Sequence, residues 1–300
     1  MLEFEQKYYS QGKQLIAGID EVGRGPLCGP VVAASVIFPK DIDIPGLTDS
    51  KKLTPKKRDM LYLEIKKKAS HIGLGVINED RIDDINILEA TLEAMRAAIS
   101  DMGIVPDMLL VDGNMKTLTN IDQESIAKGD SKSLSIAAAS VVAKVTRDRM
   151  MGQYGIIYPG YGFERNMGYG SKEHIDALKN IFSTPIHRKS FNPVSKYLPR
   201  LKDVKDRIKL KRQIAATDLI KKGHKILDVR HNSSSLDILT KERDRVYAFT
   251  LSEYTTIVDI EREARISLSL EKDISSSINI SVISVEFSKK KPIIKYRKYD

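Results

Sequence analysis

Apolar residues in the first two-thirds of the chain form short continuous runs, separated by stretches with a different spacing. The runs with the length of buried strands are at 15–22, 29–38, 71–78 and 108–113. Helices are expected at 54–69, 80–102 and 133–151 and from Lys172. The first has Thr54 and proline as a start signal, the second has apolar residues at helical spacing, and the third has a face of alanine and serine. This alternation predicts an α/β layer fold with a mixed sheet flanked by helices.

A second pattern starts after Pro199, where residues 200–212 become dense in charge. A helix is expected to end at Lys222, because the glycine that follows is a helix stop. The later strands are expected at 224–231, 235–242, 245–252, 278–287 and 292–299, with a helix near 259–270. We therefore expect two domains, 1–198 and 199–300, the second being a linker followed by a small α/β domain.

The composition narrows the class of partner. The 300 residues carry a formal net charge of +9, which favours a polyanion such as nucleic acid. No apolar run approaches the roughly 18 residues of a membrane span, so no membrane partner is expected. Cys28 is the only cysteine, which excludes an intramolecular disulfide and fits a reducing compartment, and we expect a cytoplasmic protein.

Acidic residues interrupt this pattern at three places. Asp20 and Glu21 lie inside an apolar run that Gly23-Arg24-Gly25 then ends, Asp112 closes another run, and Asp130 opens the alanine-rich helix. Isolated buried carboxylates are costly, so such acids are paired, hydrogen-bonded or bound to metal, and Asp20 alone does not decide between an ion pair and a metal site. Together the acids suit Mg²⁺ or Mn²⁺, which prefer oxygen ligands. Neighbours on a strand point to opposite faces, so Asp20 and Glu21 are expected to share a site only if the strand distorts there.

The chain resembles the ribonuclease HII family in segments that follow the family's order and spacing: AGIDEVGRGPLCGPVVAASVI, LTDSKKL, INILEATLEAM, LLVDGN, KGDSKSLSIAAASVVAKVTRDRMM, GYGSKEH and PIHRKSFNPV. The resemblance covers roughly residues 14–198 and implies a ribonuclease-H-like fold. It also implies cleavage of the RNA of RNA–DNA hybrids, and of duplex DNA on the 5′ side of a single embedded ribonucleotide. The expected ends are 3′-hydroxyl and 5′-phosphate, produced by two-metal in-line attack of water.

The same resemblance assigns roles to individual positions. The four metal-binding, catalytic acids would be Asp20, Glu21, Asp112 and Asp130. Gly23, Arg24 and Gly25 match the loop that senses the ribonucleotide, Tyr169 matches the tyrosine that packs against the neighbouring sugar, and Lys51 matches a phosphate contact. Asn166 and Met167 depart from the family, which commonly has histidine and lysine there, so one phosphate contact is expected to be missing.

Other interpretations of these residues remain open. Arg24 taken alone suggests a surface ion pair, and Tyr169 taken alone suggests packing. His187 and Arg188 are expected to tether the C-terminal helix rather than to catalyse. Ribonuclease HIII is disfavoured, because it typically has threonine at the position of Arg24 and an additional N-terminal domain, for which about twenty residues before Glu21 leave no room. A non-catalytic hybrid-binding module is the alternative function, and it would have no use for four acids.

Residues 214–251 resemble the YraN-like branch of the PD-(D/E)xK nucleases, which predicts a restriction-endonuclease-like fold for the second domain. Asp237 keeps the family's acid, whereas Ser234 and Ser235 replace a Gly-Glu pair. The expected glutamate and lysine fall near Phe249 and Leu251. We therefore expect this domain to be catalytically inactive.

Overall fold

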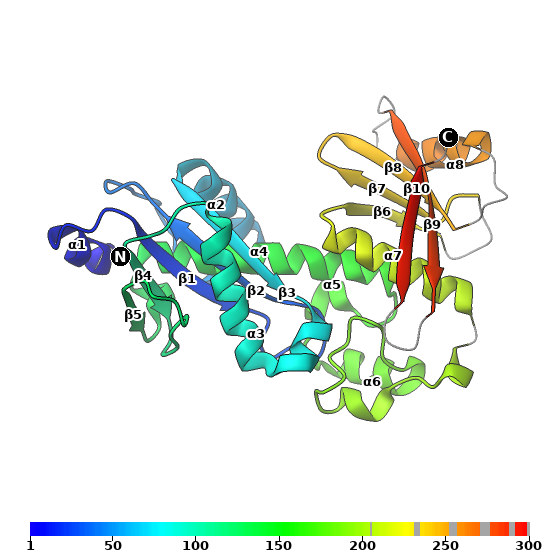
Figure 1. Ribbon diagram of the computed structural model, residues 1–300, viewed down its shortest axis with the longest axis horizontal. Helices are drawn as coiled ribbons and strands as arrows, with labels where there is room; N and C mark the ends of the chain where they lie inside the picture. Colours follow the sequence, from blue (N-terminus) through cyan, green and yellow to red (C-terminus); the bar gives the residue numbers. More distant parts are fainter. Residues whose placement is uncertain (205, 231–234, 252–256, 271–276, 288–291, 299–300) are drawn as a thin grey trace. The chain divides into compact units, whose positions relative to one another are not determined.

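The computed structural model describes residues 1–204, 206–230, 235–251, 257–270, 277–287 and 292–298 (Figure 1). Contacts divide the chain into two compact units. The first is Met1–Arg149, Met167–Gly170 and Ile186–Lys196, and the second is Met150–Asn166, Ser171–Pro185 and Tyr197–Asp300. The domain limit expected between 198 and 199 stays a prediction.

Five strands form the sheet of the first unit, in the order β3-β2-β1-β4-β5. They are β1 (Ile16–Val22), β2 (Val31–Ile37), β3 (His71–Ile77), β4 (Met108–Asp112) and β5 (Gln123–Ile126). Pairs β1–β2 and β2–β3 are antiparallel, whereas β1–β4 and β4–β5 are parallel. The mixed sheet is thus confirmed, while β5 was not predicted, because its four residues QESI contain one apolar side chain.

The helices of the first unit lie around this sheet. They are α1 (Glu3–Ser10), α2 (Pro55–Lys68), α3 (Glu79–Asp101) and most of α4 (Leu134–Ile157), with single 3₁₀ turns η1 (Ser50–Lys52) and η2 (Gly129–Ser131). Thr54 caps α2 as expected, since its hydroxyl accepts a hydrogen bond from the Lys57 amide at 3.3 Å. Helix α1 was not predicted.

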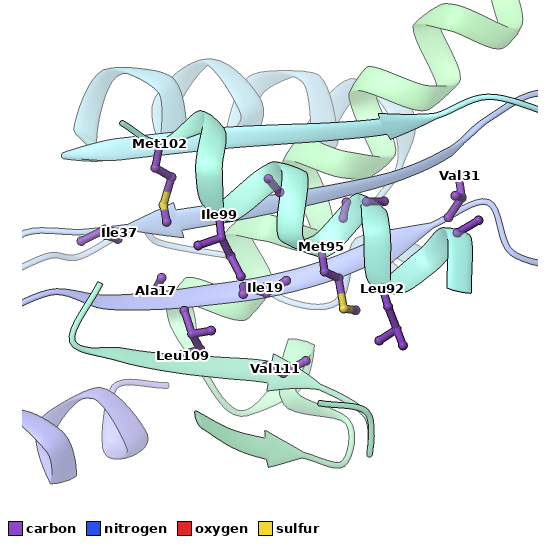
Figure 2. Close-up of a cluster of buried hydrophobic side chains, with 14 of the residues drawn as sticks. Ala17, Ile19, Val31, Ile37, Leu92, Met95, Ile99, Met102, Leu109 and Val111 are labelled. Atoms are coloured by element: carbon purple, nitrogen blue, oxygen red, sulfur yellow. The ribbon is translucent and has the colours of Figure 1, made fainter. Parts of the chain in front are cut away.

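Helix α3 packs directly on the sheet and closes the main core. Figure 2 shows Met95 and Ile99 of α3, and Met102 at its C-cap, reaching toward the strands, where Ile19 and Leu109 are fully buried. Glycines on the strands let the helix backbones approach closely. A Cβ added at Gly75 would lie 1.9 Å from the carbonyl oxygen of Ala94. This tight layer fixes the strand ends that carry the acids.

Helix α3 is not continuous, contrary to the single helix expected over 80–102. Asn86 has φ 70° and ψ 167°, so a kink separates two helical segments. Its side-chain oxygen accepts hydrogen bonds from the Leu88 amide at 2.9 Å and the Glu89 amide at 3.2 Å. Asn86 therefore caps the second segment, and asparagine followed three residues later by glutamate was the signal for it.

The second unit holds its own five-stranded mixed sheet, in the order β10-β9-β8-β7-β6. Its strands are β6 (Lys225–Val229), β7 (Ile238–Glu242), β8 (Arg245–Thr250), β9 (Ile278–Glu286) and β10 (Ile293–Lys298). Strands β8 and β9 are parallel and α8 (Ile257–Leu270) connects them, while the other pairs are antiparallel. All five strands expected here are confirmed, although the ends expected at His231, Ser252 and Tyr299 lie outside the described residues.

The remaining helical segments are α5 (Phe163–Asn166), α6 (Lys172–Ile181), η3 (Val194–Tyr197), η4 (Leu201–Asp203) and α7 (Arg207–Lys221). Helix α7 ends as expected, with Lys222 as its C-cap and Gly223 at φ 92°. Side chains of β7, β8 and α8 form the apolar core of this unit, including Leu239, Val246 and Ile260. In the described ranges, no helix is long and apolar enough to cross a membrane.

Candidate active site

Three of the predicted acids lie at one edge of the first sheet. Asp20 and Glu21 are near the end of β1, and Asp112 is the last residue of β4. The two strands are parallel with Ile19 paired to Val111, so Asp20 and Asp112 come next in register. Parallel neighbours end at the same edge, which brings the acids together. The pairing of β1 with β2 continues regularly through Val22, so no bulge separates Asp20 from Glu21, yet the Glu21 carboxylate still lies close enough to raise the pKa of Asp20.

Asp130 reaches this edge through Asp112. The Asp112 Oδ1 accepts hydrogen bonds from the amides of Gly129 at 2.7 Å and Asp130 at 3.3 Å. A Cβ at Gly129 would lie 2.6 Å from Ile136 Cδ1 and 3.2 Å from Asp112 Oδ1, so glycine leaves room for the turn to approach Asp112. The end of β4 and the turn before α4 are therefore tied together at their acids.

The acids disturb one another's ionisation. Burial raises the pKa of Asp20 well above its ordinary value, and the Glu21 and Asp112 carboxylates raise it further. Burial also raises the pKa of Glu21, although Arg24 lowers it in part, at an Nη1 to Oε1 distance of 3.3 Å. The pKa of Asp130 is raised by burial and then by Asp112 and Asp49. Crowded, buried carboxylates of this kind are stabilised by a cation.

The donor set fits a divalent cation that prefers oxygen. All four side chains offer carboxylate oxygens, the ligands of Mg²⁺ and Mn²⁺. Among the described residues, no three of these acids bring one oxygen each within 4.8 Å of one another, so the fit to the ion rests on the chemistry of the four carboxylates and not on a preformed ligand cage.

The glycine loop follows β1 directly and lies beside Tyr169. Gly23 has φ 94°, and an added Cβ there would lie 2.2 Å from Arg147 Nε. A Cβ added at Gly25 would lie 3.7 Å from Tyr169 Cε1, and the Leu27 amide donates to the Gly168 carbonyl at 2.8 Å. The fold thus brings together two predicted recognition features that are far apart in the sequence.

Two buried arginines that sequence reasoning did not place in this site hold the loop. Arg147 donates to the carbonyls of Cys28, Pro30 and Met167. Arg188 donates to four carbonyls between Gly23 and Gly29, and both arginines are 0% exposed. No sequence signal indicates that these arginines are buried. The segment PIHRKSF, for example, has no apolar periodicity that would mark its arginine as internal.

The family comparison agrees with this geometry. A model of the family described as Ribonuclease HII matches residues 17–194. Ribonuclease HII of Enterococcus faecalis is 55% identical over 194 residues, which is 65% of this chain and 76% of that protein. Ribonuclease HII of Leuconostoc mesenteroides is 53% identical over 196 residues, or 65% of this chain and 77% of that protein. The chain belongs to the ribonuclease HII family.

Solved structures give the same fold. The ribonuclease HII of a PCNA:RNase HII complex from Archaeoglobus fulgidus is 25% identical, with a TM-score of 0.52. The match covers 63% of this chain and 99% of that one. The first unit's sheet with its helices is therefore ribonuclease-H-like, and the chain is an endoribonuclease of RNA–DNA hybrids. The non-catalytic alternative is wrong, because the relatives are enzymes by name.

Lys51 of this ribonuclease HII also lies near the acids, since its charge lowers the pKa of Asp130 in part. It belongs to η1, whose Ser50 hydroxyl lies 2.8 Å from the Ser140 hydroxyl of α4. The Ser140 hydroxyl in turn lowers the pKa of Asp20 in part, so it lies close to that carboxylate. The Lys51 turn is therefore connected through two hydroxyls to the neighbourhood of Asp20.

The two departures from the family have structural roles of their own. The Asn166 side chain donates to the Tyr161 carbonyl at 2.7 Å, and the Met167 carbonyl accepts from Arg147 at 2.9 Å. Met167 has φ 51°, so it turns the chain just before Gly168. Neither position adds a cation to the site. The tethering role expected of Arg188 is directed at the glycine loop, not at a helix.

Asp237 in the second unit is buried, and both of its carboxylate oxygens accept hydrogen bonds. It pairs with Arg212 of α7, and its Oδ2 accepts from the Leu251 amide at 2.5 Å and the Thr250 hydroxyl at 3.3 Å. Phe249 is buried against Tyr247. It lies near one of the positions where the glutamate and lysine of a PD-(D/E)xK nuclease were expected. Ser235 donates from its amide to Glu263, and Ser234 lies outside the described residues.

Proposed function

We propose that this ribonuclease HII cuts on the 5′ side of single ribonucleotides embedded in duplex DNA, as well as in longer hybrids, and leaves 3′-hydroxyl and 5′-phosphate ends. The observation that carries the proposal is the position of the glycine loop. Gly23-Arg24-Gly25 follows Asp20 and Glu21 directly along the chain and lies against Tyr169. A sugar that contacts the loop would place its neighbouring phosphate at the acids.

Each group then has a separate part in the reaction. Asp20, Glu21, Asp112 and Asp130 would hold Mg²⁺ or Mn²⁺. Such ions, when bound, neutralise the phosphodiester and supply an activated water for in-line attack. Gly25 has no side chain to keep the sugar away, and Tyr169 packs beside it, so the 2′-hydroxyl would be sensed at close range. Lys51 would contact a substrate phosphate.

The direct test is cleavage of a duplex with one ribonucleotide, with Mg²⁺ and with Mn²⁺, by the wild-type chain and by Asp112→Asn. The substitution keeps an oxygen that accepts from the Gly129 amide but removes the charge, so the fold should persist. We expect cleavage to fall by about 10²-fold or more. Near-wild-type rates would exclude a role for Asp112 in metal binding.

For the second domain, 199–300, we propose a YraN-like, restriction-endonuclease-like domain without nuclease activity. The strand and helix order from α7 to β9, with a parallel crossover through α8, supports that fold. The engagement of Asp237 by Arg212 supports inactivity, because its oxygens are occupied by protein donors. Metal-dependent cleavage of all-DNA duplex that survives Asp112→Asn would contradict this assignment.

A further inference from the structure

Arg188 is the centre of the hydrogen bonding beneath the glycine loop. Its guanidinium donates to the carbonyls of Gly23 and, at 2.8 Å each, of Arg24 and Pro26, and it also donates to Gly29 at 2.9 and 3.1 Å. The side chain is 0% exposed. Such a planar fork offers five N–H donors in a fixed geometry, whereas a lysine ammonium offers three on a flexible stem and could not reach the same four carbonyls in this arrangement.

The orientation of these carbonyls determines the orientation of the amides. In a trans peptide the C=O and the next N–H point in opposite directions. The carbonyls of Gly23 and Arg24 point at Arg188, so the N–H groups of Arg24 and Gly25 point away from it. In the part of the chain that the structure describes, neither N–H has a hydrogen-bond partner.

The peptide between Pro26 and Leu27 shows what lies on the side of the loop that faces away from Arg188. The Pro26 carbonyl accepts from Arg188, and the Leu27 amide of the same peptide donates to the Gly168 carbonyl at 2.8 Å. The side facing away from Arg188 is therefore the side of the segment that carries Tyr169. Both Arg24 and Gly25 are exposed, and because glycine has no side chain, the exposed surface of Gly25 is backbone.

We infer that Arg188 is a positioning residue for ribonucleotide recognition, because it holds the Arg24 and Gly25 amides as a pair of outward donors to the sugar or its phosphate. The inference rests on the proposed function of the glycine loop and extends it to a residue outside that loop. The affinity for duplex in general would come from phosphate charge and would not depend on this geometry.

The test compares Arg188→Lys with the wild-type full-length chain. We measure kcat and KM on a duplex with one ribonucleotide, and the inhibition constant of an all-DNA duplex of the same sequence. We expect kcat to fall by about 10²-fold, as for a misplaced contact, while the inhibition constant stays within about threefold. The matched control is Arg212→Lys, since Arg212 is also a buried arginine with a fixed hydrogen-bond partner, the Asp237 carboxylate of the second unit. It should not lower kcat selectively.

A second measurement needs no variant and covers the case in which Arg188→Lys does not fold. Amide hydrogen exchange of the wild-type chain is followed in EDTA with either duplex. We expect the Arg24 and Gly25 amides to exchange fast when free, and to be protected by the ribonucleotide duplex but not by DNA. Equal protection by both duplexes, or a folded Arg188→Lys with unchanged kcat, would overturn the inference. A wild-type chain that does not cut at a single ribonucleotide would instead overturn the proposed function.

Discussion

Asp20 illustrates at the residue scale how a site is kept at the cost of stability. It is buried among Glu21 and Asp112, and its pKa in the folded chain is raised, first by burial. The folded state therefore holds the proton more tightly than the unfolded state does. Metal-free stability should consequently fall as the pH rises from the ordinary value of 3.8 through the raised one.

Asp20→Asn should remove that penalty. We expect the free energy of unfolding of the metal-free variant at neutral pH to exceed that of the wild type by about 0.5–2 kcal/mol, which is the usual size for a stabilising substitution. Thermal melting in EDTA at pH 5 and pH 7.5 measures this, and the advantage should be larger at pH 7.5. Adding Mg²⁺ should raise the melting temperature of wild type and not of the variant. A lower melting temperature for Asp20→Asn in EDTA would show that the carboxylate stabilises the fold.

Tyr169→Ala should separate recognition from binding. The ring is half-exposed beside Gly25, so its removal takes away a local contact and leaves the phosphate contacts in place. We expect kcat/KM at a single ribonucleotide to fall by about 10²-fold, with duplex affinity nearly unchanged. Tyr169→Phe is the control, because it keeps the ring and should retain most of the activity. Equal losses of affinity and rate in Tyr169→Ala would indicate a structural role.

The acids and the glycine loop could be found from residues because their chemistry interrupts an apolar pattern. Asp20 and Asp112 each stand at the end of a run, and glycine follows them closely. Arg147 and Arg188 could not be found this way, since arginine is usually exposed and nothing local shows that carbonyls will surround it. Their roles depend on hydrogen bonds between segments that are distant in the sequence.

At the scale of elements, the fit of α3 on the sheet depends on glycines in β3. Gly75→Ala would force a Cβ to within 1.9 Å of the Ala94 carbonyl, so backbone must move. We expect a decrease of about 1–3 kcal/mol in the free energy of unfolding, or more. Gly152→Ala in α4 is the control, because nothing lies within 4 Å of the added atom. That variant should gain about 0.5–1 kcal/mol in a denaturant titration, and equal stability of the two variants would refute the packing argument.

Strands and long helices could be predicted from the sequence where one face is buried. The secondary-structure predictions failed where polar side chains determine the local structure. Strand β5 is mostly polar and gains its place through pairing with β4. The kink at Asn86 interrupts an apolar spacing that continues on both sides. Helix α1 is held by Glu5, which accepts from the Ser133 and Ser135 hydroxyls, and that interaction is invisible in the local sequence.

At the scale of the whole molecule, the excess positive charge predicts a contribution of the tail to duplex binding. Arg207, Lys209 and Lys225 are exposed at the start of α7 and in β6. Replacing all three with glutamine should weaken duplex binding and flatten its log–log salt slope by up to about 0.9 for each phosphate that the tail no longer neutralises. Cleavage at saturating substrate should persist, because the acids are untouched.

The matched control replaces three other exposed arginines of the same unit, Arg243, Arg245 and Arg297, with glutamine. Binding titrations at several salt concentrations compare the two sets in the full-length chain. A truncated chain would be a poorer probe, because α7 supplies the Thr217 hydroxyl that lies 2.8 Å from the buried Tyr158 hydroxyl. Identical slopes for both variants and wild type would remove the tail from duplex binding.

The pairing of Arg212 with Asp237 has a consequence for anyone who would engineer a second nuclease into this chain. Supplying a glutamate at Phe249 and a lysine at Leu251 would restore the missing side chains but would not free the acid to bind a metal. Both oxygens of Asp237 are already occupied, by a guanidinium on one side and by an amide and a hydroxyl on the other. Removing Arg212 would leave a buried charge without its counter-ion, at a cost of roughly 3–5 kcal/mol. The inactivity proposed for this domain is thus coupled to its stability. A gain of nuclease activity would require Phe249, Leu251 and Arg212 to change together.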